Sequence, residues 1–136
     1  MQGTVTFEFD TPECAPHGPV LSRGEASGVA SHMGPVQIQI SHCPQIVGHA
    51  NGHATYVADN GDELWFEYEH TTTEPSFPMS IVGGTGRFAG ATGVATQVFT
   101  VEQEFIPGCV NPEPANCFDL TVPWNWTGTV TGTISY

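Results

Sequence analysis

Most of the chain is built from short runs in which apolar and polar residues alternate. In residues 2–9 the apolar positions are Val5, Phe7 and Phe9, separated by Thr and Glu. The same period of two recurs in residues 36–41, 46–58, 63–70, 94–105 and 124–136. Because successive side chains of a strand point to opposite faces, this pattern predicts half-buried β-strands. No stretch keeps a helical period for longer than one turn.

Residues 20–32 also alternate, but their two faces differ in size rather than in polarity. One face carries Arg23 and Glu25, and the other has only small residues: Ser22, Gly24, Ala26, Gly28 and Ala30. A face of small residues suits close packing, either inside a barrel or against a neighbouring chain. We therefore expect a strand here, and its small face is a candidate surface for self-association.

Segments rich in proline and glycine separate these runs. Residues 10–19, 71–78 and 107–116 are predicted loops. The dipeptide Asn60-Gly61 predicts a β-hairpin with a type I′ turn. Residues 81–93, IVGGTGRFAGATG, predict a tight corner between two strands, with Phe88 packed onto the body of the protein. This corner lacks the lysine and the following helix of a phosphate-binding loop.

About eight strands in succession predict one all-β domain over residues 1–136. Eight antiparallel strands in meander order can close into a small up-and-down β-barrel, which removes exposed sheet edges. We expect this closed barrel, with a β-sandwich as the second choice. In the closing strand, Trp126, Val130, Ile134 and Tyr136 alternate with Thr, Ser and Asn, so this apolar face should point inward.

The charge of the chain limits its partners. Asp and Glu number 14, Lys is absent, and Arg23 and Arg87 are the only permanent cations, giving a net charge of −12. Such a charge repels nucleic acids and anionic membranes. No apolar run approaches the ~18 residues of a membrane-spanning helix. We expect neither nucleic acid nor membrane as a partner.

Four cysteines indicate disulfides. Four cysteines allow three pairings, and we favour Cys109–Cys117 around a Pro/Asn-rich loop together with Cys14–Cys43 at strand ends. No Cys-x-x-Cys motif suggests zinc or redox chemistry. Disulfides persist in oxidising compartments, so we expect a secreted or periplasmic protein. The first residues are strand-like rather than a signal peptide, so we expect that an export signal has been removed.

Several polar side chains are candidates for chemistry, each with a simpler structural interpretation. Arg23 and Glu25 share one strand face, where they form either an exposed pair or a buried pair inside a barrel. Glu63, Glu67 and Glu69 share a face with Trp65, which favours an acidic outer stripe. If that face pointed inward, a carboxylate beside Trp65 would have a raised pKa and could act as a general acid or base.

Histidine spacing does not support a metal site. His49 and His53 are four residues apart, which on a strand separates them by about 13 Å. We expect no metal and no cofactor, and we keep His53 as a candidate ligand-binding residue with Trp126 and Tyr136. No serine–histidine–acid or cysteine–histidine arrangement is convincing as a nucleophile.

Three segments give the chain a resemblance to a known superfamily. These are LSRGEASG at 21–28, IVGGTGRFAGATGVA at 81–95 and GTVTGTISY at 128–136, and ADNGDELWFEY at 58–68 adds to them. Together with the strand pattern, they resemble the allene oxide cyclase/dirigent superfamily of β-barrels. The resemblance implies a mostly apolar cavity in the barrel, where members cyclise an allene oxide or steer the coupling of phenoxy radicals. Because the cyclases use a glutamate from the first strand, it implies Glu8 as a catalytic candidate.

Two functions are consistent with these observations. The first is a secreted β-barrel with a structural or small-apolar-ligand-binding role, which also self-associates. The second is a cyclase-like or dirigent-like enzyme that acts on an apolar molecule inside the barrel, with Glu8, Arg23 and Glu25 as catalytic candidates. Plant dirigent proteins carry an arginine after the glycine corner, where this chain has Phe88-Ala89-Gly90. That difference and the predicted disulfides favour the first function.

Overall fold

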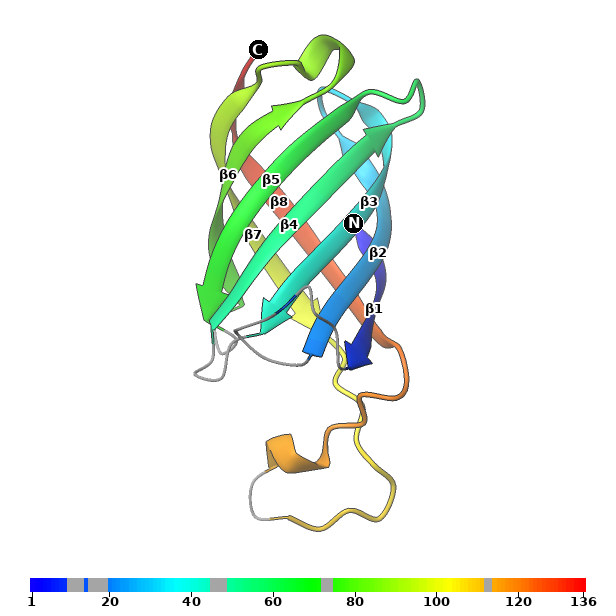
Figure 1. Ribbon diagram of the computed structural model, residues 1–136. Helices are drawn as coiled ribbons and strands as arrows, with labels where there is room; N and C mark the ends of the chain where they lie inside the picture. Colours follow the sequence, from blue (N-terminus) through cyan, green and yellow to red (C-terminus); the bar gives the residue numbers. More distant parts are fainter. Residues whose placement is uncertain (10–13, 15–19, 45–48, 72–74, 112–113) are drawn as a thin grey trace.

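A closed eight-stranded barrel forms the body of the protein (Figure 1). The computed structural model describes residues 1–9, 14, 20–44, 49–71, 75–111 and 114–136. Every strand is antiparallel to its neighbours in chain order, and β1 pairs with β8 to close the ring. The strands are β1 (Gln2–Phe9), β2 (Val20–Ala30), β3 (Gly34–Pro44), β4 (His49–Ala58), β5 (Glu63–Thr71), β6 (Ser76–Gly84), β7 (Thr92–Val101) and β8 (Trp124–Ser135). The predicted up-and-down barrel is thus confirmed, and the sandwich does not form.

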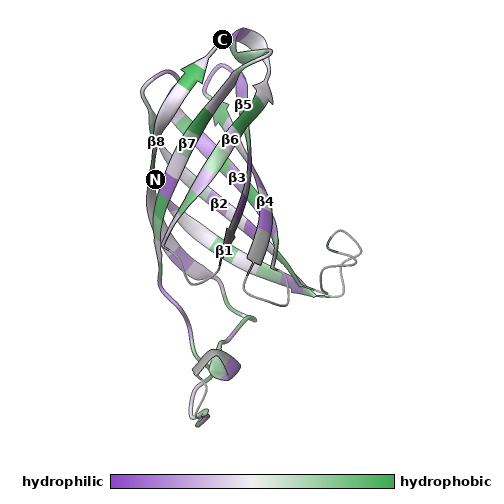
Figure 2. Cartoon of the chain, turned by 90° about the vertical axis from the view of Figure 1, so that its left-hand side faces the viewer, coloured by the Kyte–Doolittle hydropathy of each residue, from purple (hydrophilic) through white to green (hydrophobic). Residues whose placement is uncertain are grey.

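Alternation along the strands divides the barrel into an apolar inside and a polar outside. Figure 2 shows hydrophobic and hydrophilic positions alternating along the strands. On β8, Trp126 is buried and Val130 and Ile134 pack against the core, whereas the intervening threonines are exposed. The inward orientation predicted for the apolar face of this strand is therefore confirmed for these three residues.

The small face of β2 points into the barrel. Gly24 and Ala26 are buried, whereas Arg23 and Glu25 on the opposite face are exposed. A side chain at Gly24 would crowd Ile40 of β3, since its β-carbon would lie 3.2 Å from the Ile40 Cβ. The small residues of β2 therefore make room for larger side chains from the other strands. They cannot form a surface for self-association, so that part of the sequence interpretation was wrong.

Strand β6 begins earlier than the sequence suggested. Residues 71–78 were expected to form a loop, but β5 extends to Thr71 and β6 already begins at Ser76. Phe77, Met79 and Ile81 are buried at alternate positions, and burying them stabilises a strand despite the donor that Pro78 lacks. Residues 72–74 lie outside the described part of the chain. So does the loop expected at 10–19, apart from Cys14.

The hairpin between β4 and β5 is present, but its turn differs from the expected one. The Gly61 N–H donates to the Ala58 carbonyl at 2.9 Å, and the Ala58 N–H donates to the Asp62 carbonyl at 2.9 Å. These bonds put Asp59 and Asn60 at the centre of the turn, with Gly61 after them at φ 87°. This is a three-residue loop closed by a left-handed glycine, rather than a two-residue type I′ turn.

The glycine-rich corner joins β6 to β7 through the short 3₁₀ helix η2 (Gly86–Phe88). Phe88 is fully buried, and its ring meets the Tyr136 ring edge-on with centroids 5.2 Å apart. Gly84 allows this approach, since a β-carbon there would lie 2.8 Å from the Phe88 Cβ. Exposed Arg87 extends over the outer side of the Phe88 ring, 4.8 Å from its centre. The predicted role of Phe88 as a buried residue of the corner is confirmed.

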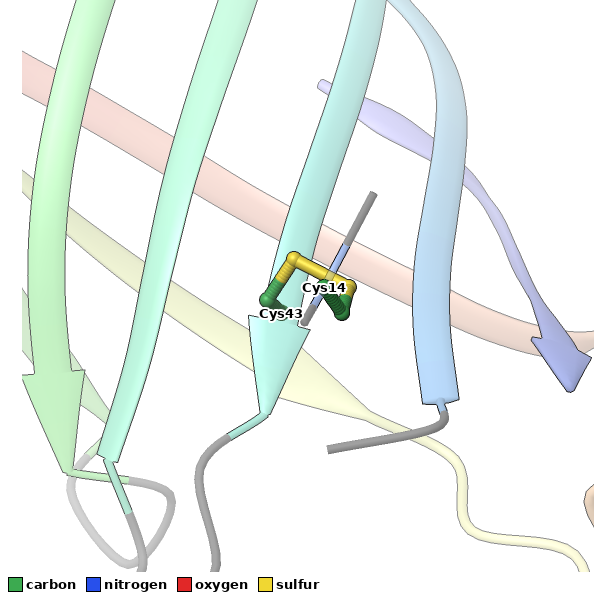
Figure 3. Close-up of a disulfide and its surroundings, with 2 residues drawn as sticks. All are labelled: Cys14 and Cys43. Carbon is green, nitrogen blue, oxygen red and sulfur yellow. A yellow bond between two sulfur atoms is a disulfide. The ribbon is translucent and has the colours of Figure 1, made fainter. Parts of the chain in front are cut away.

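Two disulfides lie at the other end of the barrel, in the predicted pairing. Cys14 bonds to Cys43 near the end of β3 (Figure 3). Cys109 bonds to Cys117 in the long connection between β7 and β8, which extends away from the barrel (Figure 1). This connection contains the 3₁₀ helix η3 (Pro114–Cys117) and an isolated bridge between Phe105 and Phe118. Two disulfides indicate an oxidising, extracytoplasmic environment.

The corner generates a stability prediction. Phe88→Ala leaves a cavity in the core and should lower the free energy of unfolding by about 3 kcal/mol or more. Arg87→Ala should cost less than about 1 kcal/mol, because that side chain is exposed and loses only its contact with one ring. Urea denaturation of both variants measures the difference. Equal losses in the two variants would contradict the assignment of Phe88 to the core.

Candidate functional site

The largest hollow of the barrel lies toward the η2 end, and we call it the large cavity. Its volume is about 290 Å³. Side chains from six of the strands form most of its wall, including Ile38, Tyr56, Phe66, Ile81, Ala95 and Val130. Met1 and the turn around His32 complete its rim. The wall is therefore mainly aliphatic and aromatic, as in most sites for small molecules.

A second hollow, the small cavity, lies in the half of the barrel toward the disulfides. It has a volume of about 70 Å³ and is lined by Trp126, Phe77 and Phe99 among others. Two polar groups also reach it: the Gln97 side chain, which is 5% exposed, and the Tyr68 hydroxyl, 3.4 Å from Nδ1 of His42. The Gln97 amide makes no hydrogen bond to another described residue. A water molecule or a polar group of a ligand would satisfy it here.

Two buried tyrosines belong to these cavities. Tyr56 donates a hydrogen bond to the Met1 sulfur at 3.7 Å, and burial raises the pKa of its hydroxyl far above the ordinary value. Burial also raises the pKa of Tyr68, and the nearby Tyr56 adds to the effect. The Tyr68 ring lies over Gly52 of β4, where a β-carbon would come within 2.5 Å of ring atoms. Both hydroxyls therefore stay neutral at physiological pH and act as hydrogen-bonding groups.

The three residues predicted as catalytic lie outside the barrel. Glu8 and Arg23 form an ion pair on the outer surface, with the Arg23 Nε 2.8 Å from the Glu8 Oε1 and both side chains more than 40% exposed. Glu25 is exposed on the same face of β2 as Arg23. Strand alternation fixes this outcome, because the inward positions of β2 are taken by the small residues. The interpretation of Arg23 and Glu25 as a buried pair was wrong, and Glu8 does not reach either cavity.

The predicted ligand-binding residues divide among three places. Trp126 points inward as expected but lines the small cavity. Tyr136 lies at the barrel end, 59% exposed, with its hydroxyl 3.4 Å from Nδ1 of His32. His53 lies on the outer face of β4, with its Nδ1 3.6 Å from the Glu67 Oε1, so its placement in a ligand cavity was wrong. Of the three, only Trp126 lines a cavity.

The acidic stripe on β5 faces solvent, as predicted. Glu67 and Glu69 are exposed, and the Trp65 indole N–H donates to the Glu63 carboxylate at 2.7 Å. These carboxylates therefore lack the apolar surroundings that raise the pKa of a general acid. Within the described residues, no group of three or more His, Cys, Asp or Glu side chains could hold a metal ion.

The polar groups that do reach the cavities were not singled out from the sequence. Gln97 was placed on the inward face with Ala95, Phe99 and Val101, so a lone amide on an apolar face was the available signal. Tyr56 and Tyr68 likewise sat on faces of small or apolar residues. His42 gave no such signal, because it precedes Cys43 near a predicted strand end.

The chemistry available in the two cavities is that of binding. Among the described lining residues there is no carboxylate and no arginine. Neutral tyrosines, one amide and two histidines can accept or donate hydrogen bonds. The arrangement therefore suits an apolar molecule with few polar atoms, since a charged ligand would lose its hydration without gaining an opposite charge.

Comparisons with known proteins identify no relative: no family model, no curated protein and no solved structure matches the chain. Within the described part of the chain, no helix has the length and apolar character needed to cross a membrane.

The buried tyrosines predict a loss of stability at alkaline pH. Both pKa values are raised in the folded state, so the neutral forms stabilise it fully below pH ~10, where unfolded tyrosine ionises. Above that pH, each tyrosine should lower the free energy of unfolding by about 1.4 kcal/mol per pH unit. Urea denaturation between pH 9 and about 11 measures this slope, and Tyr56→Phe should reduce it.

Absorbance of tyrosinate at about 295 nm provides the check on the folded protein. The chain has three tyrosines. More than one equivalent of tyrosinate near pH ~10, while the protein is still folded, would contradict the burial of Tyr56 and Tyr68.

Proposed function

We propose that this protein is a secreted β-barrel that binds a small apolar molecule in the large cavity. The observation that carries the proposal is the cavity itself, about 290 Å³ in volume with a mainly aliphatic and aromatic wall. This volume is just below the roughly 300–1,000 Å³ of typical small-molecule sites. The ligand is accordingly small, with an apolar body and at most one or two hydrogen-bonding atoms for Tyr56 or the rim.

Binding fits the cavity better than catalysis. An acid–base reaction needs an ionisable group at the reacting atoms with a pKa near the working pH. Glu8, Arg23 and Glu25 lie on the outer surface, and the raised pKa of Tyr56 keeps its hydroxyl neutral. The cyclase-like or dirigent-like alternative would thus have to rely on shape and on neutral hydrogen bonds. Membership of the allene oxide cyclase/dirigent superfamily stays a proposal that rests on the sequence motifs and agrees with the barrel.

Secretion is proposed from the disulfides and the composition. Cys14–Cys43 and Cys109–Cys117 account for all four cysteines, and such bonds persist outside the reducing cytoplasm. A protein that carries an apolar compound through an aqueous compartment needs a soluble exterior and a neutral interior. The exposed carboxylates and threonines of the barrel supply the first, and the large cavity supplies the second.

A neutral fluorescent compound tests the proposal. N-phenyl-1-naphthylamine should bind saturably, with a rise in its own fluorescence as it enters the apolar cavity. Val130→Trp, on the cavity face of β8, should weaken this binding by about tenfold or more, a change of at least ~1.4 kcal/mol. Fluorescence titration of the wild type and the variant measures both constants.

Thr127→Trp is the matched control, because Thr127 is exposed on the outer face of the same strand. It should leave the affinity unchanged. Equal weakening by both substitutions, or a wild type that never changes the fluorescence of the compound, would contradict binding in the large cavity.

A further inference from the structure

The wall of the barrel is incomplete beside the large cavity. β1 is held between β2 and β8, and Gln2 pairs with both Ser27 and Thr127. β8 continues beyond this point to Ser135, where it pairs only with β7. In Figure 1 the N-terminus lies part-way along the barrel, whereas the C-terminus reaches the η2 end. Between β2 and β8 the structure therefore has an opening, which we call the side window.

The borders of the side window are defined by specific contacts. Met1 forms one border: its amino group donates to the Gly128 carbonyl at 3.0 Å, and the Gly128 N–H donates to the Met1 carbonyl at 3.0 Å. The contact between Tyr136 and His32 forms the opposite border. The large cavity reaches this opening, because its lining includes Val29 of β2 and Thr133 of β8.

The two long sides of the window are strand edges without a partner strand. Residues of one parity direct their N–H and C=O groups to the same side of a strand. Since Gly128 bonds to Met1, the backbone groups of Val130 and Gly132 also point toward the window. On β2 the same holds for Val29, which lies opposite Pro35 of β3, a residue without an N–H.

The width of the window matches one strand. At Gln2 the strands β2 and β8 are separated by β1 alone, which is a distance of about 10 Å at the usual strand spacing. A strand placed in the window would run in line with β1 and antiparallel to both neighbours. Its alternate residues would lie opposite Val130 and Gly132 and point inward, as Met1 does.

We propose that the side window is a strand-acceptor site, which binds an extended peptide from another polypeptide in line with β1 and with apolar side chains directed into the large cavity. The interface continues the established ladder between β1 and β8, and backbone hydrogen bonds supply the affinity, as in other cases of strand addition. Outward residues of the peptide join the threonine face of β8, so they are small and polar. A peptide with a positive charge is favoured, because the protein carries a net charge of −12.

The test uses the synthetic peptide acetyl-Lys-Thr-Val-Thr-Val-Thr-amide and amide hydrogen exchange of the whole protein. In the antiparallel register, the two valines lie opposite Gly132 and Val130. The peptide should slow exchange at Val130 and Gly132 by about tenfold or more, and should leave Thr131, which already bonds to β7, unchanged. The same peptide with both valines N-methylated lacks the donors to β8 and should give no protection.

A variant pair tests the β2 side. Val29 is 84% exposed, so Val29→Pro removes a window-facing N–H at little cost to the fold, and Val29→Ala keeps it. Val29→Pro should weaken peptide binding, whereas Val29→Ala should not. Unchanged exchange at Val130 and Gly132 with millimolar peptide, or equal protection by the N-methylated peptide, overturns the proposal.

Two further outcomes would assign the window to another occupant and also overturn the proposal. Protection of Val130 and Gly132 that rises with protein concentration, without peptide, would indicate a second copy of the chain. Displacement of N-phenyl-1-naphthylamine by the peptide with no protection of these amides would indicate that only the cavity binds it. Failure of the naphthylamine to bind leaves the exchange measurement intact, so the two proposals fail separately.

Discussion

Ring closure combined with strand alternation is the constraint on which the structure depends. Once β1 pairs with both β2 and β8, every strand must present one face to a narrow interior and the other to solvent. A charged side chain on the wrong face would be buried without a partner, at a cost of several kcal/mol. All ionised side chains on the described strands therefore share the outside, and the interior is neutral. The proposed binding function follows from that neutrality.

The interior also depends on differences in size between strands. β2 contributes small inward residues, whereas β5 contributes Phe66 and Tyr68 and β6 contributes Phe77. The rings of Tyr68 and Phe77 lie 4.8 Å apart, as do those of Tyr56 and Phe66. Aromatic pairs fill much of the barrel, and the two cavities remain between them. A uniformly bulky set of strands would leave no such space.

Sequence patterns were sufficient for the fold but only partly for the site. Strict alternation and turn residues predicted the barrel, the inward face of β8 and the burial of Phe88. For β2 the same alternation allowed either face to point inward, because neither face is clearly apolar. The choice depends on how much volume the other strands contribute, which no single segment reveals. Trp126 was correctly oriented but assigned to the wrong depth, since a period of two gives the face and not the position along the barrel axis.

The central claim is that the large cavity is an apolar space inside a neutral barrel. Apolar cavities of this kind stay free of ordered water and bind xenon. Diffraction from crystals pressurised with xenon tests the claim directly. The account predicts xenon in the large cavity, in contact with Ile38, Phe66 and Ala95. Ordered water molecules hydrogen-bonded in that space, with no xenon present, would contradict it.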